Sequence, residues 1–146
     1  MVKSEVWIDQ VVRAGHRATF TFQVDKEQEG FVVRFDGRVR EEAKDLNFVL
    51  MSKEDYEKWT YWEDHRWKEK KDEAGNVMVD KEGFTVTEDV PEPETRRFLN
   101  LKSDALKEEV ALEAGTYVLV LNNKYSTVTD KSLDLHIAER WKESGP

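Results

Sequence analysis

The chain has 146 residues, 37% of them charged, and a formal net charge of −8. Acidic and basic residues are mixed along it without a basic stripe, which argues against a nucleic-acid partner. The absence of cysteine excludes a disulfide scaffold, thiol catalysis and a thiolate zinc site.

Hydrophobic residues recur with a period of two along most of the chain, which predicts antiparallel strands with one polar face. The pattern is clear at 18–24, 31–39 and 132–138. Residues 45–51 and 116–122 are apolar on both faces, so we expect them at the centre of sheets. Weaker strand patterns occur at 5–12, 76–79, 84–88, 96–102 and 106–112.

One helix is predicted between these strands. Ser52, followed three residues later by Asp55, forms a capping box, which predicts a helix over about 52–64. Residues 68–76 and 88–94 are expected to be loops, and no repeat of fixed period is found. A parallel sheet would need several crossover helices, so the chain is expected to be an all-β, antiparallel sandwich of about 8–10 strands. We expect one domain over 1–146, with a helix and loop inserted at about 53–80.

The C-terminal part carries a more specific pattern, AGTYVLVLNNKYSTVTDKSLDLHI (114–137). A glycine turn at Gly115 leads into a Tyr-Val-Leu strand (117–119), a turn at Asn122-Asn123, the pair Tyr125-Ser126, and a strand alternating through 133–137. This pattern resembles the second half of GOLD (Golgi dynamics) domains. The first half is similar to that family through residues 14–24 and through Asp45, Leu46 and Phe48.

The resemblance implies a β-sandwich of jelly-roll type, used for protein or lipid-surface recognition without catalysis. Bacterial pre-peptidase C-terminal domains have a comparable "DLxF" strand and "AGTY" corner, so they are a rival resemblance. The cysteine pair, coiled coil and membrane anchor of secretory-pathway GOLD proteins are missing from this chain.

Signatures of catalysis are missing as well. The sequence has no GxGxxG, P-loop, GxSxG or HExxH motif, and its histidines, His16, His65 and His136, are far apart. His136 alternates with apolar residues and is expected on the outer face of a strand. Adjacent carboxylates are explained by the abundance of acidic residues, and no calcium-loop motif occurs. We therefore expect no enzyme, cofactor or metal site; a metal-dependent hydrolase would rest only on these carboxylates and histidines.

The stretch WTYWEDHRW (59–67) is the strongest candidate for a binding site. On a helix, Tyr56 and Trp59 share one stripe, and we expect them to anchor the insertion over the sandwich. The expected binding residues are Tyr61, Trp62, His65, Arg66 and Trp67.

Trp and Tyr lead the residue types found at interface hot spots, which favours a protein partner. A carbohydrate-binding sandwich that uses the same rings and carboxylates is the alternative. Binding to a membrane surface is disfavoured because the chain is acidic.

Cellular location is left open by the sequence. It has neither an apolar run near eighteen residues nor an N-terminal signal pattern, which predicts a soluble chain as given. An excised domain of an exported or membrane-anchored protein would look the same. The high density of charge also suits the surface ion-pair networks of heat-adapted proteins.

Overall fold

The computed structural model of the chain describes residues 2–13, 15–40, 46–123 and 131–143. The chain divides into two compact units. Unit 1 comprises Met1–Lys53 and Arg96–Pro146, and unit 2 comprises Glu54–Thr95. The inserted segment that we expected at about 53–80 therefore continues to Thr95.

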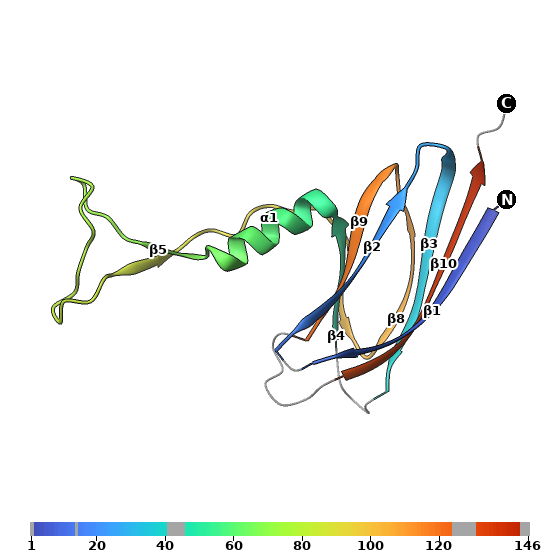
Figure 1. Ribbon diagram of the computed structural model, residues 1–146, viewed down its shortest axis with the longest axis horizontal. Coiled ribbons are helices and arrows are strands. Elements are labelled where there is room, and N and C mark those ends of the chain that lie inside the picture. Colours follow the sequence, from blue (N-terminus) through green and yellow to red (C-terminus); the bar gives the residue numbers. More distant parts are fainter. Residues whose placement is uncertain (1, 14, 41–45, 124–130, 144–146) are drawn as a thin grey trace. The chain divides into compact units, whose positions relative to one another are not determined.

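Unit 1 is an antiparallel β-sandwich, as the hydrophobic period predicts (Figure 1). One sheet has the strand order β1-β10-β3-β8 and the other the order β2-β9-β4-β7. Its strands are β1 (Val2–Val12), β2 (Arg17–Val24), β3 (Gln28–Val39), β4 (Leu46–Ser52), β7 (Arg97–Ser103), β8 (Ala105–Ala111), β9 (Gly115–Asn122) and β10 (Lys131–Glu143). The first and last strands pair in one sheet, and the second and second-last pair in the other, which is jelly-roll connectivity.

The core lies between the two sheets. Alternate residues of each strand face it, as with Phe31, Val33 and Phe35 on β3, each at most 1% exposed. Strands β4 and β9 occupy the two central positions of their sheet, which confirms the expectation from their continuous apolar runs. On these two strands the apolar side chains outside the core cluster, among them Val49 and Val120, are buried as well.

Truncation in the centre of this core tests the sandwich directly. Leu119 pairs with Leu50 across β9 and β4, and both side chains are completely buried. We expect Leu119→Ala to lower the free energy of unfolding by about 2–5 kcal/mol, because it removes apolar contacts and leaves a cavity. Thr21→Ala on the exposed face of β2 should change it by only about 0.5 kcal/mol. Urea denaturation of both variants measures the difference; similar losses would contradict this core.

One arginine bridges two opposed carboxylates on the other sheet. Asp9 of β1 and Asp134 of β10 lie directly opposite each other, where like charges repel. Arg40, just after β3, donates to both Asp134 oxygens, from Nε at 3.0 Å and Nη2 at 2.8 Å, and Nη2 also donates to Asp9. The hydrogen bond from Arg40 holds the pKa of Asp134 below its usual value.

This arrangement predicts a pH-dependent effect of Arg40→Ala. Since the folded-state pKa of Asp134 is depressed, its contribution to stability is present above the unfolded pKa, near 4, and is lost as pH falls through the folded value. The variant should melt at a lower temperature than the parent at pH 7, and the difference should shrink below about pH 4. Thermal unfolding followed by circular dichroism measures the difference in melting temperature. A difference that does not depend on pH would contradict the stabilising contact between Arg40 and Asp134.

Unit 2 interrupts the connection between β4 and β7, which pair with each other in the sandwich. It contains β5 (Trp67–Glu69), β6 (Thr87–Asp89) and all of α1 (Lys53–Asp64) except Lys53. The helix confirms the capping-box prediction. The expectation of loops at 68–76 and 88–94 is wrong in part, because β5 and β6 pair there as a short exposed ladder despite their charged residues.

The expected strands at 76–79 and 84–88 are mostly absent. Val77 forms an isolated β-bridge with Lys71, and Val79 forms one with Thr85. Neither bridge extends into a ladder of paired residues. Backbone hydrogen bonds nevertheless join three segments of the chain. Lys70 donates to Val86, Val86 to Met78, and Met78 to Lys70, at 2.8–2.9 Å.

Those three residues stand eight positions apart, which exposes a repeat that the sequence analysis missed. The Asp72 carboxylate accepts the amides two and four residues later, at 3.0 and 2.9 Å, and the Asp80 carboxylate does the same at 3.0 and 2.9 Å. Gly75 and Gly83 complete these turns with φ of 83° and 86°, a region that favours glycine. The pattern Asp-x-x-Gly, repeated after eight residues, was the signal available in the sequence.

Candidate functional site

A groove in unit 2 runs along one face of α1. The helix contributes residues spaced three and four apart, which lie on a single face. An extended segment after β6 forms the opposite wall. The groove, called the α1 groove below, encloses about 520 Å³ and is lined by Glu54, Glu57, Lys58, Tyr61, Trp62, His65, Val90, Pro91 and Pro93.

Hydrogen bonds hold the wall of the groove in place. The indole Nε1 of Trp62 donates to the carbonyl of Val90 at 2.6 Å. The amide of Val90 donates in turn to the carbonyl of Arg66 at 2.7 Å. Both backbone groups of Val90 are thus bonded, so Trp62 acts here as a support for the site. This role could not be read from the sequence, since the partner lies 28 residues away.

Arg66 joins the end of the helix to β6. Its Nε and Nη2 donate to the two carboxylate oxygens of Asp89 at 3.1 and 3.3 Å, a bidentate pair. The guanidinium carbon lies 5.1 Å from the ring centroid of Trp62 and 5.5 Å from that of Trp67. A carboxylate and two indoles therefore surround this cation, an arrangement that favours a positive charge.

The structure brings all five predicted binding residues together, but it gives them different roles. Tyr61 and Trp67 are 65% and 63% exposed. His65 stacks on the ring of Tyr61, with centroids 4.0 Å apart. Trp62 is half-buried, and Arg66 is paired with Asp89. Tyr61 and Trp67 thus provide the most exposed large hydrophobic side chains of this candidate site.

The two aromatic residues expected to anchor the insertion differ from these. Trp59 is only 8% exposed and Tyr56 is half-buried, with their ring centroids 6.3 Å apart. Their burial agrees with a structural role. Their docking over the sandwich stays a prediction.

Further exposed apolar side chains occur at the tips of unit 2, which the sequence analysis did not select. Every residue from Asp64 to Thr85 is exposed. Of nine large hydrophobic residues that are exposed in the described part of the chain, six belong to unit 2: Tyr61, Trp67, Val77, Met78, Val79 and Phe84. The sequence signal for this surface was the position of residues 77–79 between two Asp-x-x-Gly turns, because short segments between turns lie at the surface.

Charge is distributed unequally between the units. Unit 2 has 14 acidic and 6 basic residues, a formal net charge of −8, whereas unit 1 has 17 of each. The whole acidic excess of the chain therefore belongs to the segment that carries the aromatic site. The net charge of the whole chain does not show that the acidic excess is confined to unit 2.

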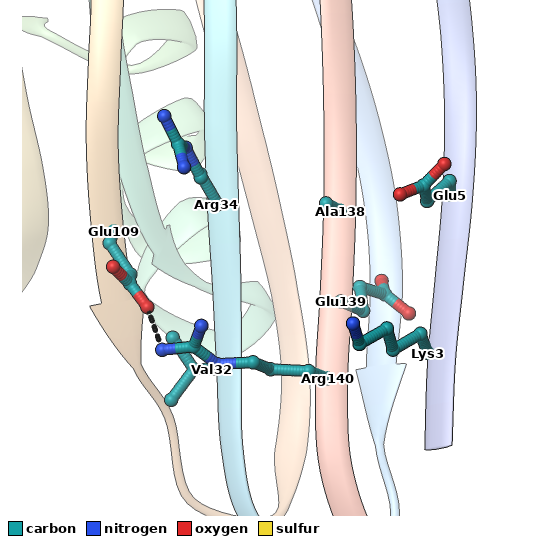
Figure 2. A pocket seen from close by; sticks show the side chains of 8 residues that line it. All are labelled: Lys3, Glu5, Val32, Arg34, Glu109, Ala138, Glu139 and Arg140. Atoms are coloured by element: carbon teal, nitrogen blue, oxygen red, sulfur yellow. Dashed lines mark hydrogen bonds and ion pairs between the residues drawn. The ribbon is translucent and has the colours of Figure 1, made fainter. Parts of the chain in front are cut away.

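The outer face of the β1 sheet has a hollow of about 160 Å³ (Figure 2). Ala138 leaves room between longer neighbours, and Arg140 reaches across β3 to Glu109, with which it forms an ion pair. Arg34 pairs with Asp36 at 2.9 Å. Burial raises the pKa of Glu139, which also lines the hollow. Cations and carboxylates compensate one another here, so the hollow has no evident preference for a charged ligand.

A larger cleft of about 660 Å³ lies in unit 1, next to the β2–β3 and β8–β9 turns. Phe31, Phe98 and Tyr117 line it together with charged residues of both signs. The hydroxyl of Tyr117 donates to the carbonyl of Glu113 at 2.7 Å, and burial raises its pKa. Arg96 lies over the ring of Phe98, with 4.4 Å from the guanidinium carbon to the centroid. Tyr117 and Arg96 are thus engaged in contacts within the protein.

His136 differs from the simple surface histidine that we expected. It lies on the outer face of β10, but the ring of Trp7 covers it, with centroids 3.9 Å apart and an angle of 13° between the planes. Its side chain is only 19% exposed. Trp7 is itself 76% exposed, which makes it a useful comparison for the tryptophans of unit 2.

Within residues 2–13, 15–40, 46–123 and 131–143, no group of three or more histidines and carboxylates could hold a metal ion. In the same ranges no helix is both long enough and apolar enough to cross a membrane. Comparison with protein-family models and with curated proteins found no significant match.

The support role of Trp62 predicts a local effect on the groove wall. Trp62→Phe keeps an aromatic ring but loses the donor to Val90, so the wall should open more often. We expect the amide of Val90 to exchange about five times faster with solvent, as the loss of about 1 kcal/mol would produce. Trp67→Phe should leave that rate unchanged. Hydrogen exchange measured by NMR compares the variants; equal rates would contradict the role of the indole.

Proposed function

We propose that the protein is a non-catalytic recognition module that binds a protein partner through the exposed aromatic surface of unit 2. The observation that carries this proposal is the concentration of six of the nine exposed large hydrophobic residues in that unit. Apolar side chains grouped on a surface indicate an interaction site, whereas scattered ones do not. Trp and Tyr are the residues that most often dominate binding energy at protein interfaces.

The construction of unit 2 supports the proposal. Its turns are held by the side chains of Asp72 and Asp80, and its helix end by the pair of Arg66 and Asp89. These polar contacts are local and leave Val79 and Phe84 61% and 70% exposed. A segment that is ordered without covering its apolar side chains has them available for a partner.

The resemblance to GOLD domains agrees with the same class of function, since it implies recognition without catalysis. Jelly-roll connectivity is compatible with that resemblance and with its pre-peptidase rival. Gly115, Tyr117 and Leu133 of the pattern belong to β9 and β10. Tyr125, Ser126 and Asp45 lie outside the described residues.

A carbohydrate ligand is supported less well. Sugars stack on the flat faces of Trp and Tyr rings, but Arg66 lies over Trp62 and Trp67, and His65 stacks on Tyr61. Each ring thus has a partner at one face already. The exposed aliphatic residues at the turns, such as Val79, have no ring face on which a sugar could stack, and they suit a protein surface.

Partner capture by matched variants tests the proposed function. Tyr61→Ala combined with Trp67→Ala should change the unfolding free energy by only about 0.5 kcal/mol, since both side chains are exposed. The same variant should lose proteins that the parent retains from a native extract, identified by mass spectrometry. Trp7→Ala removes an equally exposed indole from unit 1 and should retain them.

Equal retention by all three chains would contradict recognition through unit 2. Unfolding of the double variant would instead show that the rings belong to the folded interior. The melting curve of each chain distinguishes the two outcomes.

A further inference from the structure

We propose that the α1 groove binds an extended, arginine- or lysine-bearing peptide segment of the partner. This proposal rests on the recognition function proposed above and adds the chemistry of the ligand. Its basis is that aromatic side chains (Tyr61 and Trp62), prolines (Pro91 and Pro93) and carboxylates (Glu54 and Glu57) line the same groove.

The groove has the length of a short extended peptide. The lining residues on this side extend from Glu54 in α1 to His65, which directly follows the helix, eleven steps of about 1.5 Å, or roughly 17 Å. A peptide in the polyproline II conformation rises about 3.1 Å per residue, so about five residues fill it. The groove therefore suits a short linear segment.

The wall favours side-chain recognition over the addition of a β-strand. Pro91 and Pro93 have no amide hydrogens, and both backbone groups of Val90 are already bonded. A strand added to this wall would find few hydrogen-bonding partners. Aromatic floors beside such walls suit polyproline II segments, which need no backbone ladder.

Charge in the groove favours a cationic ligand. Two carboxylates, Glu54 and Glu57, line it together with one ammonium, Lys58, which lies 4.0 Å from the carboxylates of Glu54 and Asp55. The net charge of −8 on unit 2 adds a long-range attraction for basic segments. Tyr61, 65% exposed, lines the groove next to these carboxylates; His65 stacks on one face of its ring, so a guanidinium would take the other face.

The protein already holds one cation by this chemistry. Arg66 lies over the rings of Trp62 and Trp67 while Asp89 binds its guanidinium at 3.1 and 3.3 Å. Tyr61 with Glu57, one helical turn away, offers the same combination of ring and carboxylate toward the groove. A guanidinium of the ligand would occupy the equivalent place there.

Binding of defined peptides to the complete chain tests this inference. The probe is a fluorescein-labelled peptide of about eight residues that alternates arginine and proline, which keeps it in the polyproline II conformation. A peptide that alternates glutamate and proline is the reference. Fluorescence anisotropy measures the Kd of the parent chain and of Glu57→Lys, Tyr61→Ala and Glu69→Lys. Glu69→Lys is the matched control, because Glu69 is an exposed carboxylate of β5 in the same unit.

We expect saturable binding of the arginine peptide by the parent, with a Kd raised about tenfold by Glu57→Lys and by Tyr61→Ala. Glu69→Lys should leave the Kd within about twofold. Absence of saturable binding, or equally tight binding of the glutamate peptide, would overturn the inference. Equal losses for Glu57→Lys and Glu69→Lys would also overturn it, by showing diffuse attraction to unit 2. If the peptide fails while partner capture still depends on Tyr61 and Trp67, the recognition function stands and only the ligand chemistry is wrong.

Discussion

The ladder between β4 and β7 is the constraint on which the rest of the structure depends. These neighbouring strands pair from Leu46 with Ser103 to Met51 with Arg97. The chain therefore leaves this ladder after Met51 and re-enters it beside the same residue, at Arg97. Unit 2 thus takes the place of a simple turn between two antiparallel strands. Among the residues that the structure describes, the core between the two sheets contains no member of the insertion. Loops supported by a rigid scaffold in this way are frequent sites of function.

Unit 2 is ordered by polar contacts where unit 1 uses a core. Trp59 is the buried hydrophobic residue of unit 2 in the part of the chain that the structure describes. The carboxylates of Asp72 and Asp80, the indole of Trp62 and the pair of Arg66 with Asp89 hold the chain instead. Such bonds fix the backbone without burying apolar side chains. Order and exposed apolar surface can therefore coexist, and recognition requires that combination.

Electrostatics separates the two units in a similar way. The sandwich has equal numbers of acidic and basic residues and compensates them locally, as Arg40 does for Asp9 and Asp134. The insertion has an excess of eight negative charges. A scaffold without net charge and an acidic insertion direct long-range attraction of basic molecules toward the insertion. This distribution of charge is consistent with the basic ligand proposed for the α1 groove.

The sequence alone determined the features that depend on neighbouring residues. Alternation of apolar residues predicts the strands, because successive side chains of a strand point to opposite faces, and Ser52 with Asp55 predicts the start of α1. The continuous apolar runs around Leu50 and Leu119 also placed β4 and β9 at the centre of a sheet. The sequence brought Tyr61, Trp62 and Trp67 forward as a candidate surface, since a short helix cannot bury aromatic rings on every side.

Only the tertiary structure decided features that depend on residues far apart in the chain. Trp62 differs from Trp67 because its indole reaches Val90, and the insertion ends at Thr95 because β7 pairs with β4. The Asp-x-x-Gly repeat at Asp72 and Asp80 is present in the sequence, but only the structure shows that backbone hydrogen bonds join Lys70, Met78 and Val86 around it. Strand pairing and side-chain contacts of this kind depend on how distant segments meet in space, and local patterns in the sequence carry no information about that meeting.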